Sequence, residues 1–228
     1  MTGSIRTRAR SGVQRVVQDA TRSRRLARVI FGVDFLFPLD SGESYFDVTT
    51  PVLARVAAAH VRPSWRVVDV GTGTVAAIAL HLWHKVGCEV VATEVDLQIA
   101  ARADENIALN RAPVQLVRGS FLDGVEGRID AVVFNPPYVA TETGERRRLP
   151  DRLRSQWDGG PDGCRVIRDF LDVMASEPRR PLVFLGVNRT HVPAPRLAAL
   201  LDARPSIASE GVHRARLLPV DVYVLQKR

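Results

Sequence analysis

A four-residue segment, Asn135-Pro136-Pro137-Tyr138, carries the strongest chemical signal in this chain. An amide or ring-attached amine is a poor nucleophile because its lone pair is delocalised into the neighbouring π system. The side-chain oxygen of Asn135 and the backbone carbonyl of Pro136 can each accept one N–H of an NH2 group, which localises and aims that lone pair. The prolines make the carbonyl rigid, and Tyr138 can lie against a planar acceptor. The segment predicts attack by a planar nitrogen, whose proton leaves after the transfer without a strong base or a metal.

A glycine-containing turn upstream can hold a cofactor beside this segment. Its sequence is Asp69-Val70-Gly71-Thr72-Gly73-Thr74, at the end of the apolar run Arg66–Val70. Glycines let the backbone turn tightly and approach a ligand that a side chain would block. We expect Asp69 to orient the turn or to contact a cofactor through water. Many nucleotide-binding folds carry a similar turn, so it predicts a cofactor site without naming the cofactor.

Three further residues extend the expected cofactor site. Glu94 ends the next apolar run, 25 residues beyond Asp69, where an acid can accept hydrogen bonds from both ribose hydroxyls. Ser120 and Phe121 follow a third run, where an adenine ring would lie. Phe121 is expected to pack on that ring or to serve as a core aromatic residue.

Short apolar runs alternate with helical patterns from Arg66 onward. The pattern predicts an α/β fold: a Rossmann-like, doubly wound, mainly parallel seven-stranded sheet with a C-terminal antiparallel hairpin. Such sheets bind ligands beyond the carboxyl ends of their strands, which is where the segments above fall. A helix that Thr49 or Thr50 caps is expected before the first strand, and Asp96 is expected to cap a later one. The expected strands are 66–70, 89–93, 114–118, 129–134, 182–187, 207–212 and 220–226, and the expected helices are 47–61, 76–86, 96–110, 162–176 and 195–203.

Basic charge is concentrated at the start of the chain. Residues 1–30 contain eight arginines and one acid, Asp19, whereas the other 198 residues hold 24 basic and 24 acidic side chains. Such an arm can contact nucleic acid, the ribosome or an acidic partner, or form a solvated amphipathic helix. We expect residues 1–45 to form a basic helical extension and connector, and residues 46–228 to form the catalytic domain.

The remaining composition points to a cytoplasmic protein without a membrane segment. No apolar run has the length of a membrane span or of a signal-peptide core. Two cysteines, Cys88 and Cys164, make no disulfide framework and are interpreted as packing residues in a reducing compartment. His81 and His84 are spaced to share a helix face, but no further ligands lie nearby in sequence, so no metal site is expected.

The motifs together resemble the class I S-adenosylmethionine-dependent methyltransferases, and among them the HemK/PrmC family of protein-glutamine N5-methyltransferases. The resemblance covers about residues 45–228 through DVGTGT, ATEVD, GSFLDG, VVFNPPYV and GGPDGCRVIRDFL. The chain departs from the family at Val75, where a third glycine is usual, and at Ser120, where an acid is common. The resemblance implies S-adenosylmethionine as cofactor, held by Asp69, Gly71, Thr72, Gly73, Glu94, Ser120, Phe121 and Asn135, and an acceptor nitrogen held by Asn135, Pro136, Pro137 and Tyr138.

The acceptor itself stays open at this point. The chain is similar to the short branch of the family, which lacks the N-terminal helical domain and some of whose members need a small activator subunit. A protein glutamine is the leading expectation; a small-molecule nitrogen, a nucleic-acid base and a non-enzymatic cofactor-binding scaffold are the alternatives. The arginine-rich segment Glu142–Arg154 is interpreted as a loop at the acceptor entrance, which either reads an acidic acceptor or is simply solvated.

Overall fold

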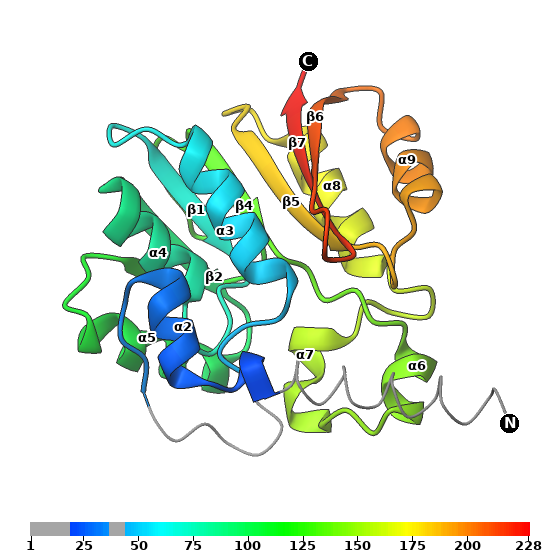
Figure 1. The fold of residues 1–228 in the computed structure, drawn as a ribbon. Coiled ribbons are helices and arrows are strands. Elements are labelled where there is room, and N and C mark those ends of the chain that lie inside the picture. Colours follow the sequence, from blue (N-terminus) through cyan, green and yellow to red (C-terminus); the bar gives the residue numbers. More distant parts are fainter. Residues whose placement is uncertain (1–18, 37–43) are drawn as a thin grey trace, which may run out of the picture.

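A seven-stranded sheet organises the described part of the chain, residues 19–36 and 44–228 of this computed structural model (Figure 1). The strand order is β3-β2-β1-β4-β5-β7-β6. Strands β1 to β5 run parallel, whereas β7 runs antiparallel between β5 and β6. The expected Rossmann-like sheet with its C-terminal hairpin is confirmed. The strands are β1 (Arg66–Val70), β2 (Glu89–Glu94), β3 (Gln115–Arg118), β4 (Ala131–Phe134), β5 (Leu182–Asn188), β6 (Ile207–Arg214) and β7 (Val220–Lys227).

Helices cover both faces of the sheet. Figure 1 shows α3 crossing in front of the central strands, with α8 on the far side. One core cluster joins the sheet to the helices of the first face, α2 (Arg24–Phe31), α3 (Thr49–His60), α4 (Ala77–Val86) and α5 (Leu97–Leu109). A second cluster joins it to α8 (Arg165–Ser176) and α9 (Ala194–Asp202). The expected helices all form, with ends within three residues of the expected bounds.

Alternation along the strands divides the side chains between these two clusters. On β4, Ala131 and Val133 belong to the first cluster, whereas Val132 and Phe134 belong to the second. Successive side chains of a strand point to opposite faces, so a continuous apolar run indicates a strand that is buried on both sides. The four residues of β4 are all buried, as this pattern requires.

The helix caps agree with the expectation in one case and differ in another. Asp96 caps α5, since its carboxylate accepts hydrogen bonds from the N–H groups of Gln98 and Ile99. Helix α3 has Val48 at its N-cap with no side-chain cap, so the expected cap by Thr49 or Thr50 is wrong. Both threonines lie inside the first turn, and their N–H groups donate to the carboxylate of Asp47 instead.

The segment Glu142–Arg154, expected to be a loop, is mostly helical. It contains α6 (Thr141–Arg146) and η1 (Asp151–Leu153) and leads into α7 (Arg154–Trp157). Trp157 closes this small unit: its indole N–H donates to the Pro150 carbonyl, and its ring packs against Gly144 so closely that a Cβ there would overlap it. Trp157 is therefore a packing residue of the α6–α7 unit.

Most of the expected basic arm lies outside the described residues, which omit residues 1–18, and residues 37–43 of the expected connector are also outside them. The described remainder packs into the first core cluster through Ala27 and Phe31 of α2. Two side chains of α5 hold the chain that follows α2. Asn106 Oδ1 accepts the Leu36 N–H, and Asn110 bonds both the N–H and the carbonyl of Asp34.

Neither Cys88 nor Cys164 forms a disulfide, and both are buried. Burial raises the pKa of the Cys88 thiol to about 11 and also raises that of Cys164. Both residues are packing residues, as expected. Among the described helices, none has the length and apolar character that a bilayer span requires.

Replacing Asn106 by alanine should lower the free energy of unfolding by about 2 kcal/mol, because the Leu36 N–H and the Thr74 carbonyl would lose their partner. For a chain of this size the melting temperature should fall by about 4–8 °C in a thermal scan. Gln98→Ala, at an exposed site on the same helix, is the control and should melt like the parent protein. Equal melting temperatures for the two variants would contradict this role of Asn106.

Candidate functional site

The expected site residues gather at the carboxyl ends of neighbouring parallel strands. β1 and β4 lie side by side with Val70 opposite Phe134, so the glycine turn and Asn135 leave the sheet next to each other. β2 lies on the other side of β1 and delivers Glu94. The strand order reverses between β1 and β4, which is where open α/β sheets bind their ligands.

The glycine turn is shaped by two left-handed backbone positions. Gly71 has a φ of 58° and Gly73 a φ of 69°, values that side chains disfavour. A Cβ at Gly73 would meet no atom within 4 Å, so open space lies beside this backbone. Thr72 fixes the turn through its N–H, which donates to the Thr93 carbonyl at 2.9 Å, and its hydroxyl, which donates to Asp69.

Asp69 ties the turn to the following helix. Its Oδ2 accepts hydrogen bonds from the Thr72 hydroxyl at 2.6 Å and from the Ala79 N–H at 3.0 Å. Burial raises the pKa of this carboxyl to about 7, against the opposing effect of those two donors. The contacts agree with the expected orienting role of Asp69.

The missing third glycine has a structural counterpart one residue later. Ala76, which is fully buried directly before α4, takes a left-handed φ of 49°. An L-residue in this conformation costs about 1–2 kcal/mol. The turn thus keeps the glycine-type backbone at Ala76, while Val75 packs in the first core cluster.

Glu94 is buried at the end of β2 and braces the glycine turn. Its Oε2 accepts the Gly73 N–H at 3.1 Å, and its Oε1 accepts the N–H groups of Val95 and Asp96. Burial raises the pKa of the carboxyl, and the three N–H donors act against that rise. A carboxylate keeps further acceptor positions beyond these bonds, so Glu94 can still receive ribose hydroxyls.

Ser120 and Phe121 lie at the end of β3 in a tight turn. Ser120 is exposed, and its carbonyl accepts the Asp123 N–H. Phe121 has a left-handed φ of 50°, and its carbonyl accepts the Thr93 hydroxyl. Its half-buried ring packs against Phe134 and Phe170 with centroids 5.9 and 5.8 Å away. Phe121 is thus a core-packing aromatic, and its contact with adenine stays a prediction.

Asn135 is held by residues from the start of α3. Its Nδ2 donates to Asp47 Oδ1 at 3.1 Å and to the Thr50 hydroxyl at 3.3 Å. Its Oδ1 is buried and has no hydrogen-bond partner within the described residues. A carboxylate can only accept hydrogen bonds, so Asp47 requires the Asn135 nitrogen to face it and the oxygen to face away.

Tyr138 is bound by the same carboxylate. Its hydroxyl donates to Asp47 Oδ2 and lies 2.7 Å from the Thr49 hydroxyl. Burial, and next the charge of Asp47, raise the pKa of Tyr138 well above its ordinary value, so the phenol stays protonated. Its ring stacks on His191 with centroids 5.7 Å apart, and contact with a planar acceptor stays a prediction.

The GGPDG turn, Gly159–Gly163, supports the backbone that follows Tyr138. Val139 forms a parallel bridge with Asp158, and the Gly159 N–H donates to the Val139 carbonyl at 2.8 Å. Gly163 has a φ of 74°, and a Cβ there would stand 2.6 Å from the Tyr138 carbonyl oxygen. The turn therefore needs glycine in order to lie against the Asn135–Tyr138 segment.

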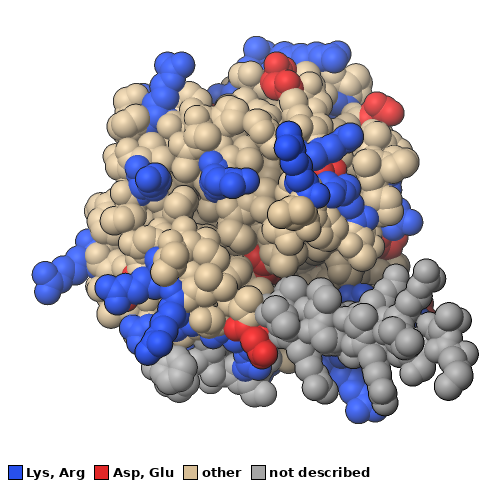
Figure 2. Space-filling view, viewed as in Figure 1, with Lys and Arg blue, Asp and Glu red and all other residues tan. Residues whose placement is uncertain are grey.

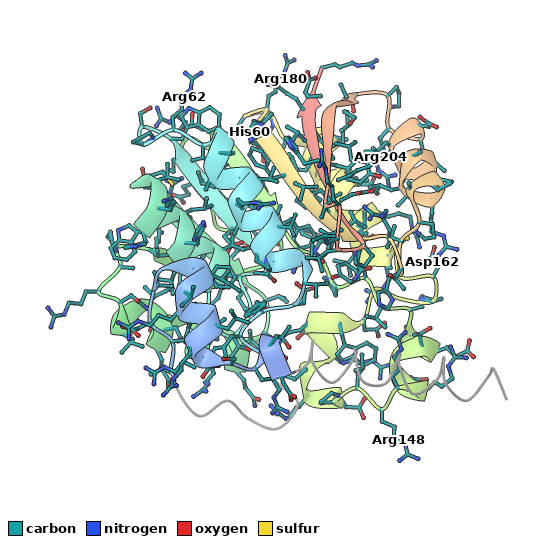
Figure 3. The ribbon with its side chains drawn as sticks, viewed as in Figure 1. His60, Arg62, Arg148, Asp162, Arg180 and Arg204 are labelled. Carbon is teal, nitrogen blue, oxygen red and sulfur yellow. The ribbon has the colours of Figure 1, made fainter. Side chains whose placement is uncertain are left out.

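The α6–α7 unit reaches from this segment back to the glycine turn. Gln156 Nε2 in α7 donates to the Thr74 hydroxyl at 2.9 Å. Arg154 makes ion pairs with Glu145 and Asp158 and lies over the Trp157 ring, so it belongs to the unit's own structure. Arg148 points away from the body of the protein (Figure 3). Of the arginines in 142–154, Arg146 and Arg147 line a groove on the acceptor side.

Sequence reasoning missed several residues of this site. Asp47, Thr49 and Thr50 were interpreted as the start of a helix and, within Tyr45–Thr50, as a loose match to a cofactor-covering stretch of the short family branch; their contacts with Asn135 and Tyr138 were not predicted, and His191 was not considered. The available sequence signal was a run of polar residues directly before an apolar helix. The structure shows that two of these residues, Thr49 and Thr50, are buried. The considered metal pair has a packing role: His81 Nδ1 lies 3.0 Å from the Phe31 carbonyl, and no cluster of metal-ligand residues occurs within the described residues.

Comparisons with known proteins find similarity to methyltransferases. Residues 42–151 match the family model for the methyltransferase small domain. A release factor glutamine methyltransferase of Deinococcus radiodurans is 38% identical over 111 residues, covering 46% of this chain and 39% of that protein. A tRNA1(Val) (adenine(37)-N6)-methyltransferase of Aeromonas salmonicida is 30% identical over 138 residues, covering 59% and 56%. A methyltransferase structure from Pyrococcus furiosus superimposes with a TM-score of 0.63 at 21% identity, covering 90% of this chain and 93% of that one.

The fold is that of the class I methyltransferases, and the expected resemblance to the HemK/PrmC glutamine methyltransferases is confirmed. The matches support an S-adenosylmethionine-dependent methyltransferase, and the open space at Gly73 beside the buried Glu94 fits that cofactor. The chain spans only 39% and 56% of the length of the two curated relatives. The activity and the acceptor of the whole protein are therefore matters of proposal.

Gly163→Ala should destabilise the protein by about 2 kcal/mol or more, because a left-handed alanine is strained and its Cβ meets the Tyr138 carbonyl. Gly211→Ala is the matched control, since a Cβ there meets nothing within 4 Å and its φ is not left-handed. Chemical denaturation of both variants measures the difference. A Gly163→Ala protein as stable as the control would show that this turn does not support the Asn135–Tyr138 segment.

Proposed function

We propose that this chain is an S-adenosylmethionine-dependent N-methyltransferase that acts on a planar, amide-like nitrogen. The proposal is carried by Asn135 Oδ1, a buried acceptor that has no hydrogen-bond partner within the described residues. A buried acceptor left unpaired costs about 1–3 kcal/mol, and a bound NH2 group would remove that cost. Because Asp47 and Thr50 already hold the amide nitrogen, the oxygen is oriented before the acceptor arrives.

The residues of the chain bind and orient the acceptor. Asn135 Oδ1 and the Pro136 carbonyl each accept one N–H, which localises the nitrogen lone pair and aims it towards the glycine turn. The bound cofactor supplies an electrophilic methyl group on its sulfonium. The acceptor proton leaves after the transfer, when the nitrogen has become acidic. Tyr138 is not needed as a base, which is consistent with its raised pKa.

We propose a protein glutamine as the acceptor. The support is the similarity to release factor glutamine methyltransferases together with the GGPDG turn that braces the site. A nucleic-acid base is the second candidate, favoured by the similarity to a tRNA adenine methyltransferase, since adenine also presents an NH2 group on a planar ring. A small-molecule nitrogen stays an alternative. An activator subunit, contact of the basic arm with nucleic acid or the ribosome, and a cytoplasmic location also stay predictions.

The non-enzymatic scaffold was motivated by Val75 and Ser120. The left-handed Ala76 restores the backbone that the third glycine would provide, and Glu94 braces the turn. These observations favour cofactor binding. Titration calorimetry with S-adenosylmethionine tests the scaffold alternative, which the absence of binding would revive.

The acceptor class can be found by methyl transfer from labelled S-adenosylmethionine into a cell extract that is then fractionated. We expect the label in protein, with methylglutamine released on proteolysis. Label in nucleic acid or in small molecules would replace the proposed acceptor and keep the proposed chemistry. No label, with cofactor binding intact, would contradict the proposed acceptor classes in that extract.

Asn135→Ala should keep the affinity for S-adenosylmethionine and lose on the order of 10² or more in turnover, as the removal of a positioning hydrogen bond does. Methyl transfer into the labelled extract measures turnover, and calorimetry measures cofactor binding. The exposed Gln98→Ala variant is the control. Near-normal turnover in Asn135→Ala would overturn the proposed mechanism.

Asp47→Asn should lower turnover by about tenfold with little change in cofactor affinity, because an amide can donate to Asn135 as well as accept from it. The Asn135 amide would then have two permitted orientations, and only one presents its oxygen to the acceptor. Asp104→Asn, an exposed carboxyl on α5, is the matched control. A loss confined to melting temperature, with turnover unchanged, would reduce Asp47 to a structural residue.

A further inference from the structure

An open groove of about 480 Å3 lies next to Tyr138, whose ring stacks on the groove residue His191. Its walls come from α6, from the GGPDG turn, from the chain after β5 and from α9, and three arginines line it: Arg146, Arg147 and Arg196. These three arginines are not among the residues of the expected cofactor site. The volume lies in the range of sites that bind small ligands or a short stretch of chain.

The groove adjoins the acceptor residues through His191. Its wall contains His191, whose ring stacks on Tyr138. It also contains Ala140, two residues after Tyr138 in the chain. Burial and then the Arg147 charge lower the pKa of His191, so this ring adds no positive charge near neutral pH. The positive charge next to the acceptor residues on this side therefore comes from arginine and not from His191.

The positive charge of the groove is not neutralised by the acid that shares it. Asp162 lines the groove, but both of its carboxylate oxygens bond to Arg168, at 2.8 and 3.1 Å. Arg196 donates to the Asp162 backbone carbonyl. Within the described residues, Arg146, Arg147 and Arg196 make no ion pair with an acidic side chain. Their guanidinium groups are matched to carboxylate or phosphate, which they bind through paired hydrogen bonds.

We propose that this groove binds acidic side chains that flank the methylated residue of a protein acceptor. The inference rests on the proposed function and adds a sequence preference to it. Charge distribution favours a peptide over a polynucleotide. Residues 31–228 balance 24 basic against 24 acidic side chains, and on the face shown in Figure 2 the Lys and Arg side chains stand as separate patches divided by uncharged surface. A nucleic-acid backbone is usually followed by a continuous basic stripe, whereas a short acidic segment needs only a local cluster.

Fluorescence anisotropy tests the proposal with three labelled probes. The first is a peptide with a central glutamine flanked on both sides by Glu and Asp, the second is the same peptide with those acids replaced by Ser, and the third is a single-stranded RNA of the same net charge as the first. We expect the acidic peptide to bind about tenfold or more tightly than the neutral one, and its affinity to fall with added salt.

Two triple variants locate the binding. Arg146→Gln, Arg147→Gln and Arg196→Gln together should weaken the acidic peptide by about tenfold or more. Arg55→Gln, Arg111→Gln and Arg216→Gln, at exposed arginines that do not line the groove, should leave its affinity unchanged. Equal affinity in both triples, or no binding of the acidic peptide, would overturn the proposal. Tighter binding of RNA than of the acidic peptide, lost in the first triple, would replace it with a phosphate site.

Asn135→Ala separates this proposal from the function on which it rests. The variant should keep the preference for the acidic over the neutral peptide, because Asn135 does not line the groove. If Asn135→Ala retains full turnover while the groove triple loses peptide binding, the proposed chemistry fails and the groove assignment stands. If turnover falls as expected and the groove triple binds normally, only the groove assignment fails.

Discussion

The carboxylate of Asp47 connects the parts of the acceptor site. One oxygen accepts from the first turn of α3 and from the Asn135 amide nitrogen, and the other accepts from the Tyr138 hydroxyl. A hydrogen bond to a charged group contributes about 1.5–3 kcal/mol, roughly twice a neutral one. Since a carboxylate offers no donor, these bonds also set direction: the phenol must donate, and the Asn135 oxygen must face away from Asp47. The reactive orientation of one amide thus depends on a single charged group in another element.

Around this carboxylate, a backbone contact supports the acceptor segment, and a side-chain hydrogen bond connects it to the cofactor half. The GGPDG turn lies so close to the chain at Tyr138 and Val139 that a Cβ at Gly163 would overlap the Tyr138 carbonyl oxygen. The α6–α7 unit that lies between them in sequence contacts the glycine turn through Gln156 and Thr74. The same unit brings Arg146 and Arg147 to the groove, so acceptor binding and cofactor binding share one support.

The features that the sequence predicted correctly depend on short stretches of neighbouring residues. The strand ends at Val70, Glu94 and Phe134 follow from apolar runs that are buried on both faces, and the Asp96 cap follows from residue type and position alone. The glycine turn and the Asn135–Tyr138 segment were identifiable because each is contiguous. The third glycine shows the limit of such prediction: Val75 indicated weakened cofactor affinity or a reshaped turn, whereas the left-handed conformation occurs one residue later, at the fully buried Ala76. The segment 142–154 was misread because its short helices depend on packing around Trp157 and not on helical periodicity.

The sequence by itself determined the class of fold, the strand ends at which the candidate site lies, and the residue types that we propose to bind a planar nitrogen. Tertiary structure decided how the side chains of the candidate site are oriented. Asp47 and Asn135 are 88 residues apart, and their hydrogen bond exists only because α3 packs across the sheet against β5 and β7. Likewise, α6, the chain after β5, and α9 bring Arg147, His191 and Arg196 to one groove. Hydrogen bonds and ion pairs act over a few ångströms, so residues distant in sequence acquire these roles only once the chain has folded.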